Sequence, residues 1–182
     1  MPASVHVLLT GHPANPQRFH QRVDATIARA ADGGLVLGYR IQGLNLDLHV
    51  PTPHTPAPAE ALWKTTCCEL FIGPSARPTY REFNFSPSGQ WAAYRFRAYR
   101  DRDNGFVPPA APQLELQRHA SGFRLSARIA PELLPPGRVF NIGLSAVVEA
   151  ADGGKSYWAL AHAAAQPDFH LRPSFTLTLN RP

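Results

Sequence analysis

The segment spanning residues 80–100, YREFNFSPSGQWAAYRFRAYR, constrains the fold more than any other stretch of the chain. Two runs of strand-like alternation flank Ser86-Pro87-Ser88-Gly89. Proline presets φ for a turn, and glycine supplies the positive φ that closes it. The segment is therefore predicted to be a β-hairpin. Because side chains alternate between the two faces of a strand, the register of this hairpin decides which residues act together.

Treating those four residues as the loop places Phe85 near Gln90 and Asn84 near Trp91. One face of the hairpin is then apolar and is predicted to be core: Phe83, Phe85, Ala92, Tyr94 and Phe96. The opposite face mixes rings, a carboxylate, an amide and guanidinium groups: Tyr80, Glu82, Asn84, Trp91, Arg95, Arg97 and Tyr99. This second face is too polar for a core and too aromatic for an idle surface, so it is predicted to bind a ligand.

The rest of the chain consists of similar short runs separated by turn signals. Strands are predicted over residues 4–10, 23–27, 35–41, 43–50, 65–73, 113–118, 123–129, 139–149, 156–160 and 174–179. Residues 51–61, which contain four prolines, are predicted to be an irregular surface loop. About eleven strands with almost no helical periodicity predict a single domain over residues 1–182. Its expected fold is an antiparallel β-sandwich, jelly-roll-like, with an immunoglobulin-like sandwich as the alternative description.

Two further strands bear on the expected ligand face. In TTCCELFIG, alternation assigns Cys68, Leu70 and Ile72 to the core and leaves Glu69 on the opposite side. In the last hairpin, a turn at Ala151-Asp152-Gly153 is predicted to put Tyr157 and Ala159 on the apolar face. Trp158 would then lie on the other face as a ledge over two small residues, Gly143 and Ser145.

Charge and termini limit the classes of partner. The formal charge of +5 comes mostly from scattered arginines, and no nucleic-acid reading motif is present, so nucleic acid is not expected as a partner. The apolar run at residues 5–9 is too short for a signal peptide or a membrane span, which predicts a cytoplasmic protein without a membrane partner. Cys67 and Cys68 are adjacent in a strand and point to opposite faces, which disfavours a disulfide between them.

Several motifs occur in a recognisable order: Trp63, Glu69 six residues later, YREFNFSPSGQWAAYRF, NIGLSAVVE, SYWALAH and PDFHLRPSF. From about Leu8 onward this order resembles the DOMON-like family related to type 9 carbohydrate-binding modules. The resemblance implies a sandwich that binds a ligand on a sheet face or its rim, with sugars in the type 9 modules and haem in some DOMON domains. Trp63 and Glu69 match the Trp and Glu at the start of a family strand. Trp158 is the implied second ring of a pair of tryptophans that sandwiches a sugar.

The same resemblance raises two cofactors that this sequence does not otherwise support. DOMON domains that bind haem use a Met and a His, whereas the only methionine here is Met1, so haem would need two of the eight histidines. Type 9 modules commonly hold calcium, but this chain has no carboxylate-dense loop. We therefore expect no cofactor.

Two alternative sites remain open at this stage. His162, Asp168 and His170 could ligate a metal, although their spacing matches no known ligand pattern and a hydrogen-bonded loop explains them better. Glu69 and Glu82 could be a glycosidase pair. The competing interpretation pairs these carboxylates with arginines that keep them ionised and oppose the raised pKa of a general acid: Arg81, Arg95 and Arg97.

The function predicted from the sequence is a non-catalytic module that binds a carbohydrate-like small molecule. Its expected binding residues are Trp63, Glu69, Glu82, Asn84, Trp91, Arg95 and Trp158. The first alternative is a haem- or metal-binding domain that uses histidines, and the second is a small glycoside hydrolase. No protein partner can be predicted from the sequence.

Overall fold

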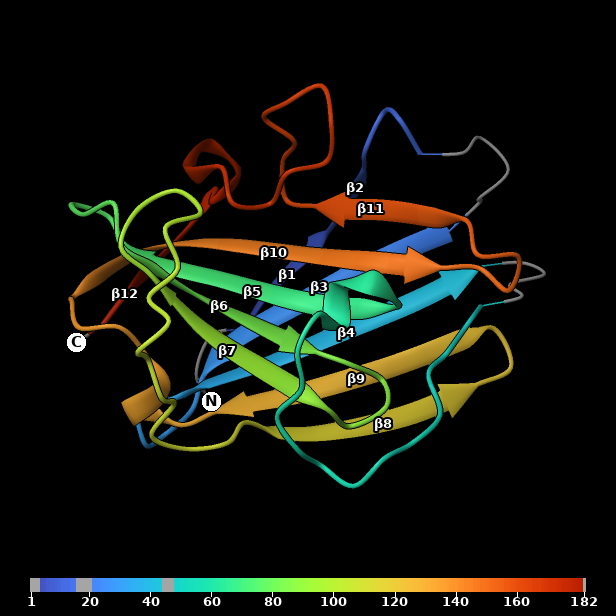
Figure 1. Cartoon of the computed structure of the whole chain (residues 1–182), viewed down its shortest axis with the longest axis horizontal. Coiled ribbons are helices and arrows are strands. Elements are labelled where there is room, and N and C mark those ends of the chain that lie inside the picture. Colours follow the sequence, from blue (N-terminus) through green and yellow to red (C-terminus); the bar gives the residue numbers. More distant parts are fainter. Residues whose placement is uncertain (1–3, 16–20, 44–47, 182) are drawn as a thin grey trace.

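A computed structural model describes residues 4–15, 21–43 and 48–181. Two antiparallel sheets pack face to face in this part of the chain (Figure 1). The smaller sheet has the order β1 (Ser4–Leu8), β3 (Gln21–Arg29), β4 (Leu35–Gly43), β9 (Gly122–Ile129), β8 (Gln113–His119). The larger sheet has the order β2 (Thr10–Gly11), β11 (Lys155–Ala159), β10 (Val139–Glu149), β5 (Cys67–Pro74), β6 (Tyr80–Phe85), β7 (Trp91–Phe96), and β12 (Leu177–Asn180) also pairs with β10.

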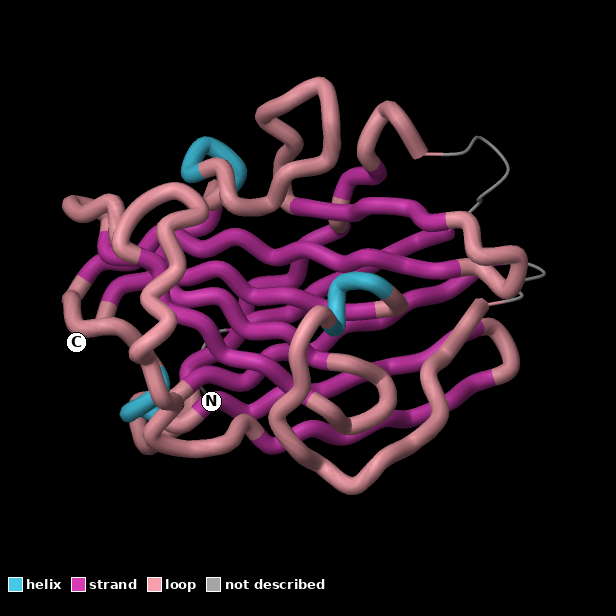
Figure 2. Tube along the Cα trace, viewed as in Figure 1, coloured by secondary structure: helices cyan, strands magenta, loops and turns pink. Residues whose placement is uncertain are grey.

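Helical structure in the described residues is limited to three short 3₁₀ turns, η1 (Leu62–Lys64), η2 (Pro131–Leu133) and η3 (Arg172–Ser174). Figure 2 shows how little of the chain they occupy beside the strands. The predicted antiparallel β-sandwich is therefore confirmed, as are most of its strands. Among the described residues, no helix is long and apolar enough to cross a membrane.

The main core lies between the two sheets because each strand directs every second side chain inward. On β5 the inward residues are Cys68, Leu70 and Ile72, as predicted, and all three are fully buried. The smaller sheet contributes Leu35, Leu37, Tyr39 and Ile41 from β4. The buried Tyr39 hydroxyl donates a 2.6 Å hydrogen bond to the carbonyl oxygen of Glu69, which ties the two sheets together.

Three hairpins share one turn geometry. In each, the backbone N–H of the residue before the loop donates to the carbonyl of the residue after it: Ala30 to Gly34, Ser86 to Gln90 and Ala150 to Gly154. The N–H of the last loop residue, a glycine, donates to the carbonyl of the residue before the loop. The third loop residue is always a glycine with positive φ, 89° at Gly33, 92° at Gly89 and 82° at Gly153. This is the three-residue loop with a left-handed glycine that hairpins commonly use.

The turn geometry corrects the predicted register of the hairpin over β6 and β7. A three-residue loop pairs Phe85 with Trp91, whereas a four-residue loop pairs Asn84 with it. Because the side-chain period is two, the one-residue shift moves every residue of β7 to the other face. Tyr94 and Phe96 therefore lie on the outer face of the larger sheet, and Trp91 points into the main core.

The predicted faces of β11 are also wrong, although the predicted turn over residues 151–153 is the one observed. Val147 pairs with Tyr157, and Ala146 pairs with Trp158. Trp158 consequently packs against the main core, where its indole N–H donates to Ser156 Oγ at 3.0 Å. Tyr157 takes the outward position that the sequence prediction gave to the tryptophan.

The segment before β5 mixes described and undescribed residues. Of the strand predicted over residues 43–50, positions 44–47 lie outside the described residues, and Leu48 forms an isolated bridge with Ala150. Residues 51–61 form the predicted irregular loop, which runs beside the edge of the larger sheet. There Trp91 N–H donates to the Ala57 carbonyl, so the loop covers part of the edge strand β7.

Candidate functional site

The outer face of the larger sheet carries a second cluster of buried apolar and aromatic side chains, separate from the main core: Leu62, Cys67, Phe71, Tyr80, Ala92, Tyr94, Phe96 and Phe175. A pocket of about 410 Å³ opens over this cluster. Its lining comes from β5, β6, β7, β10 and β11, together with η1 and the loops at residues 97–112 and 160–171. The pocket is therefore built on strands and enclosed by loops that are distant in sequence.

Two glutamates lie in this pocket on adjacent strands. Glu69 of β5 is 3 % exposed and Glu82 of β6 is 4 % exposed. Ser145 Oγ donates to Glu69 Oε2 at 3.2 Å, and Asn84 Nδ2 donates to Glu82 Oε1 at 2.9 Å. Burial raises the pKa of Glu82 to about 7. Burial and the neighbouring Glu82 carboxyl raise the pKa of Glu69 well above its ordinary value.

A buried histidine stands beside Glu82. His170 Nε2 is 3.6 Å from Glu82 Oε2, and His170 Nδ1 is 2.8 Å from the Tyr80 hydroxyl. The backbone N–H of Arg100 donates to that hydroxyl at 3.1 Å, which leaves the tyrosine proton free to bind Nδ1. Burial lowers the pKa of His170 to about 4, so the imidazole is neutral at neutral pH.

Aromatic rings form the walls. Trp63 on η1 is 41 % exposed and makes an edge contact with Tyr94, with ring centroids 6.2 Å apart. Tyr157 and Phe169 meet on another part of the lining, with centroids 6.3 Å apart. Phe96 packs edge-on against His170, with ring centroids 5.0 Å apart. Several ring faces and edges are therefore available to a ligand that enters the pocket.

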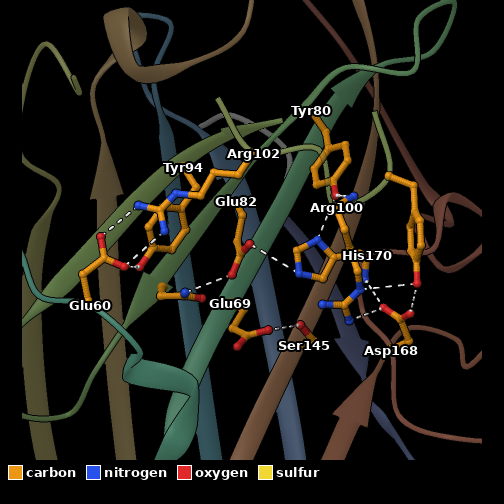
Figure 3. Close-up of polar contacts among 12 residues, drawn as sticks. Glu60, Glu69, Tyr80, Glu82, Tyr94, Arg100, Arg102, Ser145, Asp168 and His170 are labelled. Carbon is orange, nitrogen blue, oxygen red and sulfur yellow. Dashed lines mark hydrogen bonds and ion pairs between the residues drawn. The ribbon is translucent and has the colours of Figure 1, made fainter. Parts of the chain in front are cut away.

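Two arginine–carboxylate pairs flank the glutamates, one on each side, in Figure 3. Arg102 Nη2 donates to Glu60 Oε1 at 2.8 Å, and the guanidinium lies 4.1 Å from the Tyr94 ring centroid. Arg100 Nη2 donates to Asp168 Oδ1 at 2.9 Å. Both arginines are thus held by carboxylates while they line the pocket.

The segments that enclose the pocket hold unusual backbone conformations. Among the described residues, only Ala61 and Arg100 combine a side chain with a positive φ, 57° and 55° respectively. Ala61 precedes the turn that presents Trp63, and Arg100 lies in the loop that supplies both pocket arginines. Left-handed backbone at a non-glycine residue is uncommon and tends to occur at ligand sites.

Three of the residues predicted from the sequence come together here: Trp63, Glu69 and Glu82. Asn84 is fully buried and reaches the site only through its hydrogen bond to Glu82. Trp91 and Trp158 pack with the main core, on the opposite faces of β7 and β11 from those predicted.

Arg95 also lies away from the pocket. The shifted register of β7 places it on the opposite face from Glu82. Its guanidinium pairs with Asp103 at 2.5 Å and lies 5.0 Å from the Phe106 ring centroid.

The expected partners of the two carboxylates are also different from the prediction. Arg81 donates to the Leu133 carbonyl, Arg95 pairs with Asp103, and Arg97 pairs with Asp101. Strand alternation directs all three away from Glu69 and Glu82. The glutamates are therefore not held ionised by these arginines, and their pKa values are raised, not lowered.

The three candidate metal ligands have other partners. His162 Nε2 donates to the Thr10 carbonyl at 2.8 Å, Asp168 binds Arg100, and His170 binds Tyr80. The described residues contain no group of three or more His, Cys, Asp or Glu side chains arranged to hold a metal ion. Among the described residues that line the pocket, His170 is the one histidine, whereas haem bound without methionine would need two.

Sequence reasoning missed several pocket residues, among them Tyr94, Phe96, Arg100, Arg102, Tyr157 and Phe169. Tyr94, Phe96 and Tyr157 were assigned to the wrong face. For Tyr94 and Phe96, the signal that would have corrected the face is the glycine at the third loop position, which recurs at Gly33, Gly89 and Gly153. For Tyr157, the predicted turn already gives the observed pairing with Val147. Phe169 and the two arginines lie in loops, whose position no periodicity predicts.

Comparison with known proteins identifies solved structures that share this fold. No protein-family model matches the sequence, and no curated protein is significantly similar to it. The architecture is shared with solved carbohydrate-binding structures. A protein from Bacteroides uniformis, described as a candidate carbohydrate-binding protein, matches with a TM-score of 0.67 and 13% identity over 97% of this chain and 85% of that one.

Two structures of a family 9 carbohydrate-binding module from Caldicellulosiruptor kristjanssonii are similar as well. The complex with cellotriose has a TM-score of 0.54 at 11% identity, covering 94% of this chain and 80% of that one. The complex with glucose has a TM-score of 0.53 at 11% identity, covering 94% and 83%. The chain therefore has the β-sandwich fold of these carbohydrate-binding modules.

Proposed function

We propose that this protein is a non-catalytic module that binds a carbohydrate-like small molecule in the pocket on the outer face of the larger sheet. The observation that carries the proposal is the combination of Glu69 and Glu82 with a partly exposed Trp63 at one wall. We further propose, from the motif order around Trp63 and Glu69, that the chain is a DOMON-like relative of the type 9 modules.

The chemistry of the pocket suits a sugar. The flat ring of Trp63 can stack on the apolar C–H face of a pyranose, and the carboxyl groups can accept hydrogen bonds from its hydroxyls. The volume of about 410 Å³ falls in the range of small-molecule sites. The similar modules that were solved with glucose and cellotriose support the same ligand class.

Tryptophan fluorescence tests the proposal directly. Trp63 lines the pocket while Trp91 and Trp158 pack against the core, so a bound sugar should change the emission of Trp63 above all. We expect saturable changes with at least one of a panel of mono- and disaccharides at millimolar concentration. Calorimetry should show that Trp63→Ala abolishes binding while Trp63→Phe, which keeps a ring, retains part of it. Val36→Ala on the far sheet is the control and should bind like the wild type.

A response from no sugar in that panel, with the protein shown to be folded by circular dichroism, would falsify the proposal. Binding that is unchanged in Trp63→Ala would contradict the assignment of the site while leaving sugar binding in place.

Glycoside hydrolysis is a second candidate, and one observation favours it. Glu82 has a pKa raised to about 7 beside a second buried carboxyl, and a retaining or inverting glycosidase needs one carboxyl protonated and the other ionised. Release of nitrophenol from aryl glycosides tests this candidate. Wild-type turnover that is lost in both Glu82→Gln and Glu69→Gln would establish hydrolysis. No turnover of any aryl glycoside in the panel would rule against hydrolysis and favour the binding module.

A further inference from the structure

Two carboxyl groups in the pocket have no arginine or lysine partner. Arg102 is paired with Glu60 and Arg100 with Asp168, so both of its guanidinium groups are already neutralised by carboxylates. Glu69 and Glu82 make no ion pair with an arginine or lysine in the part of the chain that the structure describes. The nearest ring nitrogen, on His170, belongs to an imidazole that burial keeps neutral.

The hydrogen bonds of the pocket floor are also incomplete. Glu69 receives one side-chain donor, the Ser145 hydroxyl, and Glu82 receives one, the Asn84 amide. A carboxylate has about four acceptor sites, so most remain unfilled. Asn84 Oδ1 is buried and has no partner among the described residues. The surrounding side chains therefore supply fewer donors than the floor has acceptor sites.

We propose that the ligand of this pocket carries a protonated amine, and that Glu69 and Glu82 bind it. The chemical class is an amino sugar with a free amino group. This inference rests on the proposed function, because it keeps the sugar ring on Trp63 and adds one charged group to it. An ammonium supplies three donors to the unfilled acceptors and a positive charge beside the carboxylate that forms when it binds. The aromatic rings around the floor also favour a cation over a neutral group.

Binding of the ammonium is linked to a proton. The glutamates face Arg100, Arg102, His170 and Asp168 across the pocket, and Tyr80, Tyr94 and Glu60 stand behind these groups. Burial holds protons on the empty glutamate pair. When the ammonium binds, the O–H bond of a carboxylic acid breaks, its proton passes to solvent, and the resulting carboxylate accepts hydrogen bonds from the ammonium. The charge of the pocket is then balanced by the ligand.

A comparison of three sugars tests the inference at about pH 6. Glucosamine carries the ammonium, glucose replaces it with a hydroxyl, and N-acetylglucosamine keeps the nitrogen without the charge. Calorimetry should show glucosamine binding on the order of tenfold tighter than glucose, as expected of a charge-assisted hydrogen bond in a desolvated site. Titrations in two buffers with different ionisation enthalpies should show proton release with glucosamine and none with glucose.

Each result has a distinct meaning. If none of the three sugars, nor any sugar of the wider panel, binds, the proposed function itself is wrong. If glucose or N-acetylglucosamine binds as tightly as glucosamine, the preference for an amine is overturned and the carbohydrate-binding function stands.

Variants then assign the amine contact. In Glu82→Gln the ratio of glucosamine to glucose affinity should fall toward one, and Glu69→Gln serves as the second variant if the first does not fold. Glu115→Gln, an exposed carboxylate on β8 of the other sheet, is the matched control and should keep the wild-type ratio. A ratio that stays at the wild-type value in both pocket variants would overturn the assignment to these glutamates.

Discussion

The two outer faces of the sandwich have the same strand alternation and opposite character. On the larger sheet, loops and η1 cover the outward side chains, and Phe71, Tyr80, Glu69 and Glu82 are buried there. On the smaller sheet the outer face is open, and a row of polar side chains crosses it from β3 to β8: Asp24, Arg40, Arg124 and Gln117. The two faces differ because loops from distant parts of the chain cover one of them, and not because their strands alternate differently.

The open face also contains a hollow, but its groups interact differently. It lies over Gly38, where an added Cβ would meet Thr26 Oγ1 at 2.7 Å. Asp24 is paired there with Arg22 at 2.9 Å and His6 at 3.3 Å, and the pKa of Asp24 is lowered by the hydrogen bond from Arg22. Asp24 is 6 % exposed, close to the 4 % of Glu82, so the two carboxyl groups differ mainly in their partners. An arginine keeps Asp24 ionised, whereas no arginine or lysine pairs with Glu82 among the described residues.

The largest expected difference between the faces is in packing. Phe71→Ala should lower the free energy of unfolding by about 3 kcal/mol or more, because Phe71 is 1 % exposed within the second cluster. Val36→Ala on the outer face of the smaller sheet, where the side chain is 40 % exposed, should change it by less than about 0.5 kcal/mol. Urea denaturation measures both. Equal losses would show that the outer face of the larger sheet is not a second core.

The second largest expected difference between the faces is in how the free energy of unfolding depends on pH. The pKa of Glu82 is raised from 4.5 to about 7 on folding, so its stabilising contribution is complete below 4.5 and is lost as the pH rises through 7. The stability of Glu82→Gln relative to the wild type should therefore rise between pH 4.5 and 7, by on the order of 3 kcal/mol.

His170 acts in the opposite direction, because its pKa is lowered from 6.5 to about 4 and its contribution is lost as the pH falls through 4. It is present in both proteins and cancels in their difference. Chemical denaturation at a series of pH values measures this difference, and a flat profile would contradict a buried, protonated Glu82.

The hydrogen bonds behind the pocket should have a smaller effect. Tyr80→Phe removes the acceptor of the Arg100 N–H and the partner of His170 Nδ1, which should cost about 1–2 kcal/mol of stability. Tyr157→Phe removes a pocket hydroxyl for which the described residues provide no hydrogen bond, and it should cost less than about 0.5 kcal/mol. Thermal unfolding compares them. Similar losses would indicate that the Tyr80 hydroxyl does not stabilise the site.

The smallest effect is expected on the open face. Arg40 and Arg124 are direct cross-strand neighbours of like charge. Arg124→Glu should stabilise the protein by about 0.2–1 kcal/mol by placing opposite charges side by side. The gain should disappear at about 1 M salt, which screens exposed charges within a few ångströms. A gain that persists in high salt would point to packing rather than electrostatics.

Much of this fold could be predicted from the sequence because local rules determine it. Alternation identified most strands, the core face of β5 and the outward position of Glu69. The motif order predicted Trp63 as a candidate ligand ring, and the structure places it in the same pocket as Glu69 and Glu82. The strand assignments needed only the period of two within one strand.

Only the tertiary structure decided the rest. The hydrogen bond from Ser86 N–H to the Gln90 carbonyl sets the register in which Tyr94, and not Trp91, lies on the pocket face. A loop one residue longer would move every side chain of β7 to the other face. Burial of Glu69 and Glu82 depends on loops from distant parts of the chain. The sequence by itself thus determined which strands form, whereas their registers and the covering loops decided which side chains meet and which lose contact with water.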